Sequence, residues 1–243
     1  MVDREAFANA VFLGAAVPIH GPVTPGNPRW FWPSITRYEF SRDKAKALLA
    51  SIGLENRDTD EWLEDAKGTE ARLTLQTFRG NRVLERSATV VSDELRQVGI
   101  ALDVVPLETN AVRQSVMKGD FEAAFIAFFT NDPDPAMSKD LWVSSGGAHF
   151  WHIGQTKPAT EWERQIDELM AKQASTLDET ERKRLFIEVQ RIFADNLPML
   201  HFAAPRVYIG ASARLLGLMP ALTRPHIMWS PDTLAVANAT RSQ

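Results

Sequence analysis

The sequence predicts an α/β protein built on a β-α-β-α-β core, and three observations predict this class. Three runs of seven or eight residues, at 71–78, 101–107 and 121–128, have the composition of strands. Two stretches with helical spacing of apolar residues, at 83–98 and 110–118, separate these runs, and a glycine closes each stretch. Units of this kind form parallel sheets with right-handed crossovers. The 243 residues are enough for one large domain or two small ones.

The first predicted strand alternates Leu73, Leu75 and Thr77 with polar residues, as a half-buried strand does. The helix after it ends at Gly99, and the shorter helix that starts at Asn110 ends at Gly119. The apolar positions of the longer helix are Val83, Leu84, Ala88, Val91, Leu95 and Val98.

The third strand leads into the loop that we expect to matter most. Pro133 and Pro135 cannot continue a central strand ladder, so the strand must end before them. Ligands in open α/β sheets bind beyond the carboxyl ends of the strands. We therefore predict that this loop, with Phe128, Phe129, Asn131 and Asp132, helps to line a ligand pocket. An ordinary exit from a strand is the alternative.

Helices should flank this core on both sides in the sequence. Asp3 can cap a helix that runs through Phe7 and Val11 to Gly14. Residues 43–52 place Ala45, Leu48, Leu49 and Ile52 on one helical face. Two long helices begin at Thr160 and Asp178, each with a glutamate three residues later, as in a capping box. The aromatic residues Trp30, Phe31 and Trp32 form either a hydrophobic plug, the preferred interpretation, or a binding surface.

Composition excludes several classes of function. The net charge is −4 and no basic stripe stands out, so nucleic acid is not an expected partner. The absence of cysteine excludes disulfides, thiolate catalysis and cysteine-based metal sites. No apolar run is as long as a membrane span, and residues 1–5 contain no signal-peptide core.

No specific catalytic motif is present: the sequence contains no Gly-x-Ser-x-Gly, no Walker loop and no Gly-x-Gly-x-x-Gly. A small hydrolase or transferase could use His149 or His152 with Asp132 or Asp134, but it would lack a recognisable nucleophile. Zinc at the two histidines would need at least one more ligand. The two aspartates, which lie beside prolines, are better interpreted as Asx turns.

The acidic stretch at 56–67 matches a calcium loop only in part. Asn56, Asp58 and Asp60 supply oxygens at the required spacing. Glu61 stands where such a loop needs glycine, and Lys67 where it needs a bidentate glutamate. We interpret the stretch as a solvated turn, and we predict no metal and no cofactor for this chain.

Aromatic residues accumulate around the central loop. Apolar walls with a few polar groups suit a small-molecule pocket, and ring faces suit sugars or amphipathic ligands. The alternative is that these rings belong to the core. The candidate ligand-binding residues are Phe128, Phe129, Asn131, Asp132, Trp142, His149, Trp151 and His152.

Six stretches in order resemble the family 5 extracellular solute-binding proteins of ABC importers, which bind peptides, nickel or oligosaccharides. The resemblance covers about the C-terminal half of a family member. The stretches are Asp3-Arg-Glu-Ala-Phe7, Gly21-Pro22 to Pro25-Gly26, Asp43-Lys-Ala-Lys-Ala-Leu-Leu-Ala50 through Gly53, Glu94-Leu-Arg-Gln-Val-Gly-Ile100, Gly119-Asp-Phe121, and Pro133-Asp-Pro135 followed by Ser144 to Gly147.

This resemblance implies one periplasmic-binding-protein-like lobe of a two-lobed fold that closes around a solute. Residues 1–205 would form the C-terminal lobe, and residues 206–243 would return to pack on the N-terminal lobe. That lobe and the secretion signal would lie upstream. The implied partners are a small solute and a permease in the inner membrane, and the implied location is periplasmic or cell-surface.

One departure from the family bears on the solute. Peptide-binding members carry an aspartate that pairs with the amino terminus of the ligand, and the corresponding residue here is Asn131. An amide cannot give an ammonium group the charged partner that it prefers. The family's tryptophan three residues earlier is matched by Phe128. We therefore expect a neutral, polyhydroxylated or otherwise non-zwitterionic solute. A truncated fragment that does not bind by itself is a further alternative.

Overall fold

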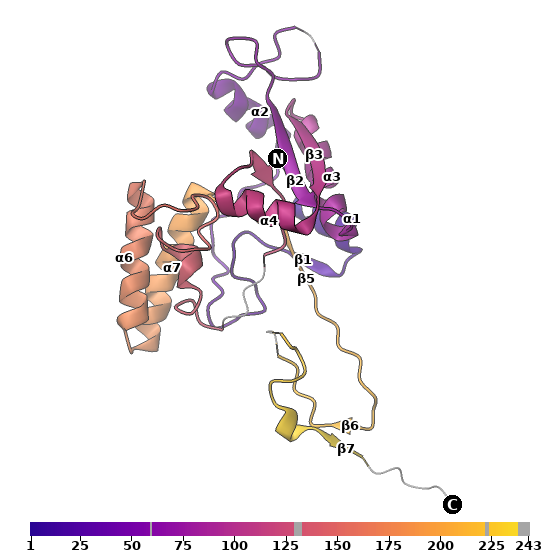
Figure 1. The fold of residues 1–243 in the computed structure, drawn as a ribbon, viewed down its shortest axis with the longest axis vertical. Helices are drawn as coiled ribbons and strands as arrows, with labels where there is room; N and C mark the ends of the chain where they lie inside the picture. Colours follow the sequence, from indigo (N-terminus) through magenta and orange to yellow (C-terminus); the bar gives the residue numbers. More distant parts are fainter. Residues whose placement is uncertain (59, 129–132, 222–223, 238–243) are drawn as a thin grey trace, which may run out of the picture.

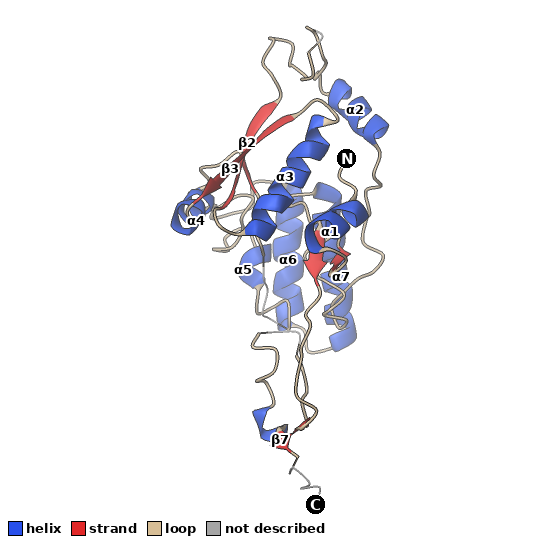
Figure 2. Ribbon diagram, turned by 90° about the vertical axis from the view of Figure 1, so that its right-hand side faces the viewer, coloured by secondary structure: helices blue, strands red, loops and turns tan. Residues whose placement is uncertain are grey.

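The computed structural model describes residues 1–58, 60–128, 133–221 and 224–237. Its centre is a parallel three-stranded sheet in the order β3-β2-β4 (Figure 1). β2 spans Arg72–Phe78, β3 spans Ala101–Leu107 and β4 spans Ala123–Ala124. Between the strands lie α3 (Arg82–Arg96) and α4 (Thr109–Lys118), so the predicted β-α-β-α-β order is confirmed. The two helices cover opposite faces of the sheet (Figure 2), as two right-handed crossovers in opposite directions require.

The third strand is much shorter than the predicted run of 121–128. Only Ala123 and Ala124 pair with β2, and one further backbone bond joins the Phe125 N–H to the Gln76 carbonyl at 2.8 Å. The carboxylate of Glu122 accepts a hydrogen bond from the Thr74 N–H at 2.7 Å, and the Thr77 hydroxyl donates one to the Phe125 carbonyl at 3.0 Å. Side chains thus replace the ladder bonds at both ends, and the strand ends there.

The apolar core has two separate clusters. One lies where α1 (Arg4–Phe12) and α3 cover the sheet, and it includes Phe7, Val11, Leu75, Ala88, Val91 and Leu102. The other fills the hairpin of α6 (Glu161–Ser175) and α7 (Glu179–Asn196), on which the short α5 (Lys139–Trp142) packs. Its buried members are Trp30, Leu141, Trp142, Ile166, Met170, Phe186, Val189, Ile192 and Phe193. Trp30 is 3% exposed, which confirms that this ring is a hydrophobic plug.

The helix at 43–52 does not bury its apolar face. It forms α2 (Arg42–Ser51) at the edge of the molecule (Figure 1), and none of its residues is buried. Leu48 is 69% and Ile52 is 73% exposed. Ala45 and Leu49 of the same face are half-buried, so the described part of the chain covers this face only in part. No helix in the described part of the chain is both long and apolar enough to cross a membrane.

A second, two-stranded sheet joins the segment after α1 to the segment after α7. β1 (Ala16–Pro18) pairs antiparallel with β5 (Ala203–Pro205). Just before β5, the Nε of Arg4 donates to the His201 carbonyl at 2.7 Å, and the His201 ring packs on Phe193. Burial, and secondarily the charge of Arg4, lowers the pKa of His201 to about 4. The imidazole is therefore neutral at neutral pH.

This histidine should make the folded state sensitive to mild acid. Its pKa is lower in the folded chain than in the unfolded chain, so the unfolded chain takes up the proton first. The contribution to stability is full above pH 6.5 and is lost as the pH falls toward about 4, by about 3 kcal/mol in all. Urea unfolding of His201→Gln across this range should show a flatter profile. An unchanged slope in His201→Gln would contradict the assignment.

The tail leaves the body after Arg206, whose N–H and guanidinium bond to the Ala15 and Gly14 carbonyls at 2.8 and 2.9 Å. It extends away as a separate ribbon (Figure 1), in which β6 (Leu215–Leu216) pairs antiparallel with β7 (Ala235–Val236) and a 3-10 turn spans Pro231–Thr233. Large apolar side chains of the tail remain exposed, among them Tyr208, Met219, Met228 and Trp229.

Candidate functional site

The candidate site begins where β4 ends. Phe128 is half-buried, and its ring meets the edge of Phe150 at 5.8 Å and 80°. Phe129, Asn131 and Asp132, which the sequence analysis selects, lie outside the described residues. The described part of this edge is therefore aromatic.

From Pro133 the described residues form the turn that the sequence predicts. The Oδ1 atom of Asp134 accepts the Ala136 N–H at 2.9 Å, as in an Asx turn. The same oxygen accepts a hydrogen bond from Arg182 of α7 at 2.7 Å. Burial alone would raise the pKa of Asp134, but the bonds from Arg182 and from the backbone outweigh it and leave the pKa below its ordinary value. Asp134 is thus an ionised anchor.

His149 is fully buried and points at a buried carboxylate. Its Nε2 lies 3.2 Å from the Oε1 atom of Glu163, which is 2% exposed, and its Nδ1 lies 3.4 Å from the Leu141 carbonyl. The Gln155 amide reaches the same Oε1 at 3.1 Å. This arrangement ties the segment at 149–155 to the start of α6.

The other oxygen of Glu163 completes the predicted capping box. Oε2 accepts the Ala159 and Thr160 N–H groups at 3.0 and 2.9 Å, and the Thr160 hydroxyl at 2.9 Å. Burial would raise the pKa of Glu163, but the bonds from His149, Thr160 and Gln155 outweigh it and lower the pKa to about 2. One carboxylate therefore caps a helix and holds a buried histidine.

The remaining candidates divide into buried and accessible side chains. Trp142 is 3% exposed and its ring contacts Phe186 and Phe193, so it belongs to the core of the α6–α7 hairpin. Trp151 is half-buried and packs on His149 with ring centroids 3.9 Å apart. The side chain of His152 is 51% exposed, with its Nδ1 4.0 Å from Glu163. Trp151 and His152 are thus open to a ligand, whereas Trp142 and His149 are not.

The proposed catalytic pairs do not form among the described residues. His149 faces Glu163 instead of Asp134, and Asp134 pairs with Arg182. Neither group is free to activate a nucleophile or a water. The pair of His149 with Asp134, which the enzyme hypothesis names, is therefore absent from the structure.

A hollow lies at the neighbouring strand end, and the sequence analysis did not identify it. Its volume is about 550 Å³, and it opens where β2 passes into α3. Arg79, which lines it, donates to the Pro106 carbonyl at 3.1 Å and pairs with Glu108 at 3.4 Å. The complete lining is Phe78, Arg79, Gly80, Asn81, Arg82, Val83 and Thr109. The carboxyl edge of the sheet thus combines a polar hollow with aromatic rings.

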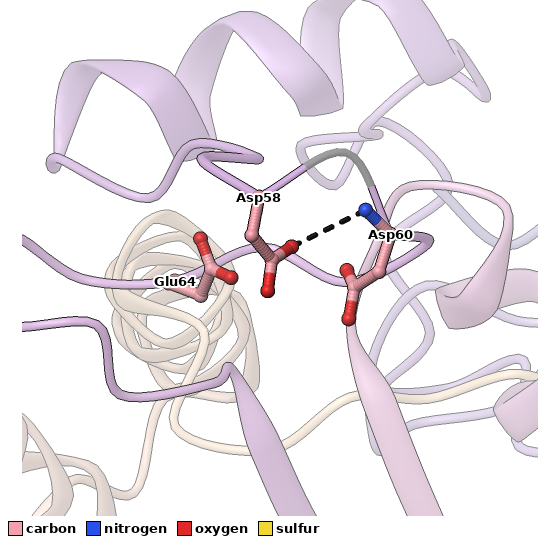
Figure 3. A group of neighbouring side chains, drawn as sticks. All are labelled: Asp58, Asp60 and Glu64. Atoms are coloured by element: carbon pink, nitrogen blue, oxygen red, sulfur yellow. Dashed lines mark hydrogen bonds between the residues drawn. The ribbon is translucent and has the colours of Figure 1, made fainter.

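Among the described residues, one acidic group has metal-ligand spacing: Asp58, Asp60 and Glu64 (Figure 3), with carboxylate oxygens within 4.8 Å of one another. These carboxylates accept hydrogen bonds from backbone N–H groups of the same loop. Asp58 accepts the Asp60 N–H at 3.2 Å, Asp60 the Trp62 N–H at 2.7 Å, and Glu64 the Arg57 N–H at 2.9 Å. In a calcium loop that starts at Asn56, Glu64 would stand at a ligand position, but the position that needs a bidentate glutamate is Lys67, and Glu61 stands where glycine is needed. The arrangement supports the interpretation as a turn.

Comparison with known proteins decides the family. Residues 1–150 match the family model described as bacterial extracellular solute-binding proteins, family 5, in its middle part. This is more than half of the chain. The chain belongs to the family 5 solute-binding proteins. The resemblance carried by the six sequence stretches is confirmed.

The relatives are considerably longer than this family 5 chain. A probable ABC transporter-binding protein of Deinococcus radiodurans is 24% identical over 228 residues, which are 89% of this chain and 38% of that protein. The oligopeptide-binding protein AppA of Bacillus subtilis is 25% identical over 226 residues, 89% of this chain and 39% of that protein. The chain thus spans less than two fifths of the length of these relatives.

Solved structures share the fold of this family 5 chain. AppA of Bacillus subtilis, in complex with a nonapeptide, aligns with a TM-score of 0.72 and 22% identity over 97% of this chain and 45% of that one. MelB of Agrobacterium fabrum, in complex with stachyose, aligns with a TM-score of 0.74 and 20% identity over 83% of this chain and 32% of that one. The predicted periplasmic-binding-protein-like α/β lobe is confirmed.

Proposed function

We propose that this chain is one lobe of the solute-binding component of an ABC importer, which captures a small solute between two lobes and delivers it to a membrane permease. The observation that carries the proposal is the family match over residues 1–150, in a chain that spans 38–39% of its relatives. Closure would follow because a solute that contacts both lobes favours the closed state. We assign the chain no catalytic role, and we place the working protein outside the cytoplasm, in the periplasm or at the cell surface.

The tail supports the proposed division into a lobe and a return segment. Residues 1–205 hold both core clusters and all three strands of the parallel sheet, whereas residues 206–243 include a ribbon that leaves the body. Tyr208 is 72% exposed and Met219 is 60% exposed, and several exposed large apolar side chains on one segment suit an interaction surface. We propose that the N-terminal lobe covers this segment.

The solute would bind at the carboxyl edge of the sheet. Phe128 and Trp151 would supply aromatic surface, and the hollow at β2 and the exposed His152 would supply polar groups. We propose in addition that Phe129, Asn131 and Asp132 contact the solute, with Asn131 as a hydrogen-bonding group. Trp142 and His149 would support this surface from beneath.

The proposed solute class is neutral and polyhydroxylated, such as an oligosaccharide. Asn131 offers no charge for the amino terminus of a peptide, and amides and aromatic faces suit sugars. A structural relative in complex with stachyose and another in complex with a nonapeptide show that this fold holds ligands of both kinds.

Isothermal titration of the protein that carries both lobes tests the proposal, with stachyose and tri-alanine as probes. We expect stachyose to bind, and Trp151→Ala to weaken binding by roughly tenfold through loss of a stacking face. The control Trp62→Ala removes a ring that lies between Arg72 and Arg96 at the other edge of the sheet, and it should leave the affinity unchanged. Tight binding of tri-alanine without binding of stachyose would overturn the solute class.

A further inference from the structure

Arg182 differs from the other arginines of α7 in the direction of its contacts. Arg184 and Arg191 pair with glutamates three residues away on the same helix, Glu181 and Glu188. Arg182 instead pairs with Asp134, 48 residues earlier in the chain. The side chains of this pair are 17% and 22% exposed, against 64% and 42% for Arg184 and Glu181. Exposed pairs contribute little to stability, whereas a pair removed from water requires a fixed geometry.

The guanidinium of Arg182 joins three separate segments. Its Nη2 donates to Asp134 Oδ1 at 2.7 Å, and its Nε donates to the Gln173 carbonyl near the end of α6 at 3.1 Å. Its Cζ atom lies 5.2 Å from the centre of the Trp30 ring, and the Trp30 carbonyl accepts a hydrogen bond from the Gln190 amide at 3.1 Å. The α6–α7 hairpin and the aromatic loop (residues 27–32) thus hold the guanidinium. The third segment that it reaches is the turn that contains Asp134.

On the other side of the pair, Asp134 organises the turn at 133–137. Its Oδ1 accepts the Ala136 N–H at 2.9 Å, and its carbonyl accepts the Met137 N–H at 3.0 Å. Asn27 of the aromatic loop reaches the Pro133 carbonyl at 3.5 Å. The turn that follows the proposed ligand loop is therefore fixed through one ion pair and its neighbours.

We propose that Arg182 is a positioning residue for solute binding: through Asp134 it fixes the turn at 133–137 to the α6–α7 hairpin, without touching the solute. This inference rests on the proposed function, since the turn follows directly on the segment that we assign to the solute. Lysine could replace the charge, but it has no planar fork that reaches Asp134 and the Gln173 carbonyl together. The position therefore requires arginine.

Hydrogen–deuterium exchange on the 243-residue chain tests the anchor directly. In Arg182→Gln, exchange at the Ala136 and Met137 amides should rise roughly tenfold, while exchange in α3 stays unchanged. Asp134→Ala should give the same rise, the double variant should add nothing to either single one, and Arg182→Lys should give an intermediate rise. The matched control Arg184→Gln, which removes an exposed pair on the same helix, should change exchange there by less than about twofold.

An equal effect in Arg182→Gln and Arg184→Gln would overturn the anchor, and so would a rise spread evenly over α3, α6 and α7. Titration with stachyose separates this inference from the proposed function. Arg182→Gln should weaken stachyose binding roughly tenfold, while hydrogen exchange in β2 and α3 stays unchanged. Arg182→Lys should recover part of the lost affinity. If the wild-type protein binds neither stachyose nor tri-alanine, the proposed function fails and the solute-positioning role fails with it, whereas the exchange data still decide whether Arg182 holds the turn.

Discussion

Replacing Glu163 with alanine should lower the free energy of unfolding by about 2–4 kcal/mol, because it removes a helix cap, about 1 kcal/mol, and leaves a buried histidine nitrogen unsatisfied, about 1–3 kcal/mol. The change removes the acceptor of the Thr160 and Ala159 N–H groups and leaves the buried His149 without its carboxylate. A capping interaction alone contributes about 1 kcal/mol, so most of the loss should come from His149. Urea unfolding followed by tryptophan fluorescence measures it, because the Trp151 ring packs on His149.

Two comparisons separate this effect from a general loss of charge on α6. Glu168→Ala removes an exposed carboxylate of the same helix that pairs with Arg164, and it should cost less than about 0.5 kcal/mol. Glu163→Gln keeps the shape and an acceptor, and it should lie between the two. A cost below about 1 kcal/mol for Glu163→Ala would contradict the assignment.

The lowered pKa of Glu163 also predicts that the wild-type chain loses stability in acid. The pKa of Glu163 is about 2 in the folded state against an ordinary 4.5, so the folded state holds its proton less tightly than the unfolded state. Its contribution is complete above pH 4.5 and is lost as the pH falls toward 2. This window lies below that of His201, so a wild-type titration should show two successive losses that Glu163→Gln and His201→Gln remove separately.

Periodicity predicted the fold because its information is local. Leu75 and Thr77 alternate with polar residues in β2, and glycines at 99 and 119 end the helices, so neighbours in sequence decide these elements. The length of β4 could not be predicted in this way. Thr77 and Glu122 end it through contacts across 48 residues of sequence, and an apolar run carries no sign of them.

The site shows the same limit more strongly. The sequence predicted the capping role of Glu163, because the Thr160 pattern is local, and it predicted the Asx turn at Asp134. It did not show that Glu163 also holds His149, or that Asp134 pairs with Arg182. Both contacts join residues that the tertiary fold brings together. The carboxylates were therefore recognised as turn and cap residues, while their long-range hydrogen-bond partners were missed.

Phe186→Ala should destabilise the helical half by about 3–5 kcal/mol, the range for truncation of a buried phenylalanine. The ring is 2% exposed and meets Trp30 and Trp142 edge-on, at 5.9 and 5.2 Å. The adjacent Ile187 is 37% exposed, and Ile187→Ala should cost less than about 1 kcal/mol. Urea unfolding followed by circular dichroism compares the two, and a cost for Phe186→Ala no greater than that of Ile187→Ala would contradict the packing.

Phe186→Ala also tests whether the two core clusters unfold together. Phe186 belongs to the cluster inside the α6–α7 hairpin, and the cluster between α1, α3 and the sheet has no residue in common with it. If the clusters are independent, hydrogen exchange should rise in α6 and α7 and stay low in β2 and α3. An equal rise in β2 would mean that the lobe unfolds as one cooperative unit. The α6–α7 hairpin would then hold the ligand edge and the sheet in place together.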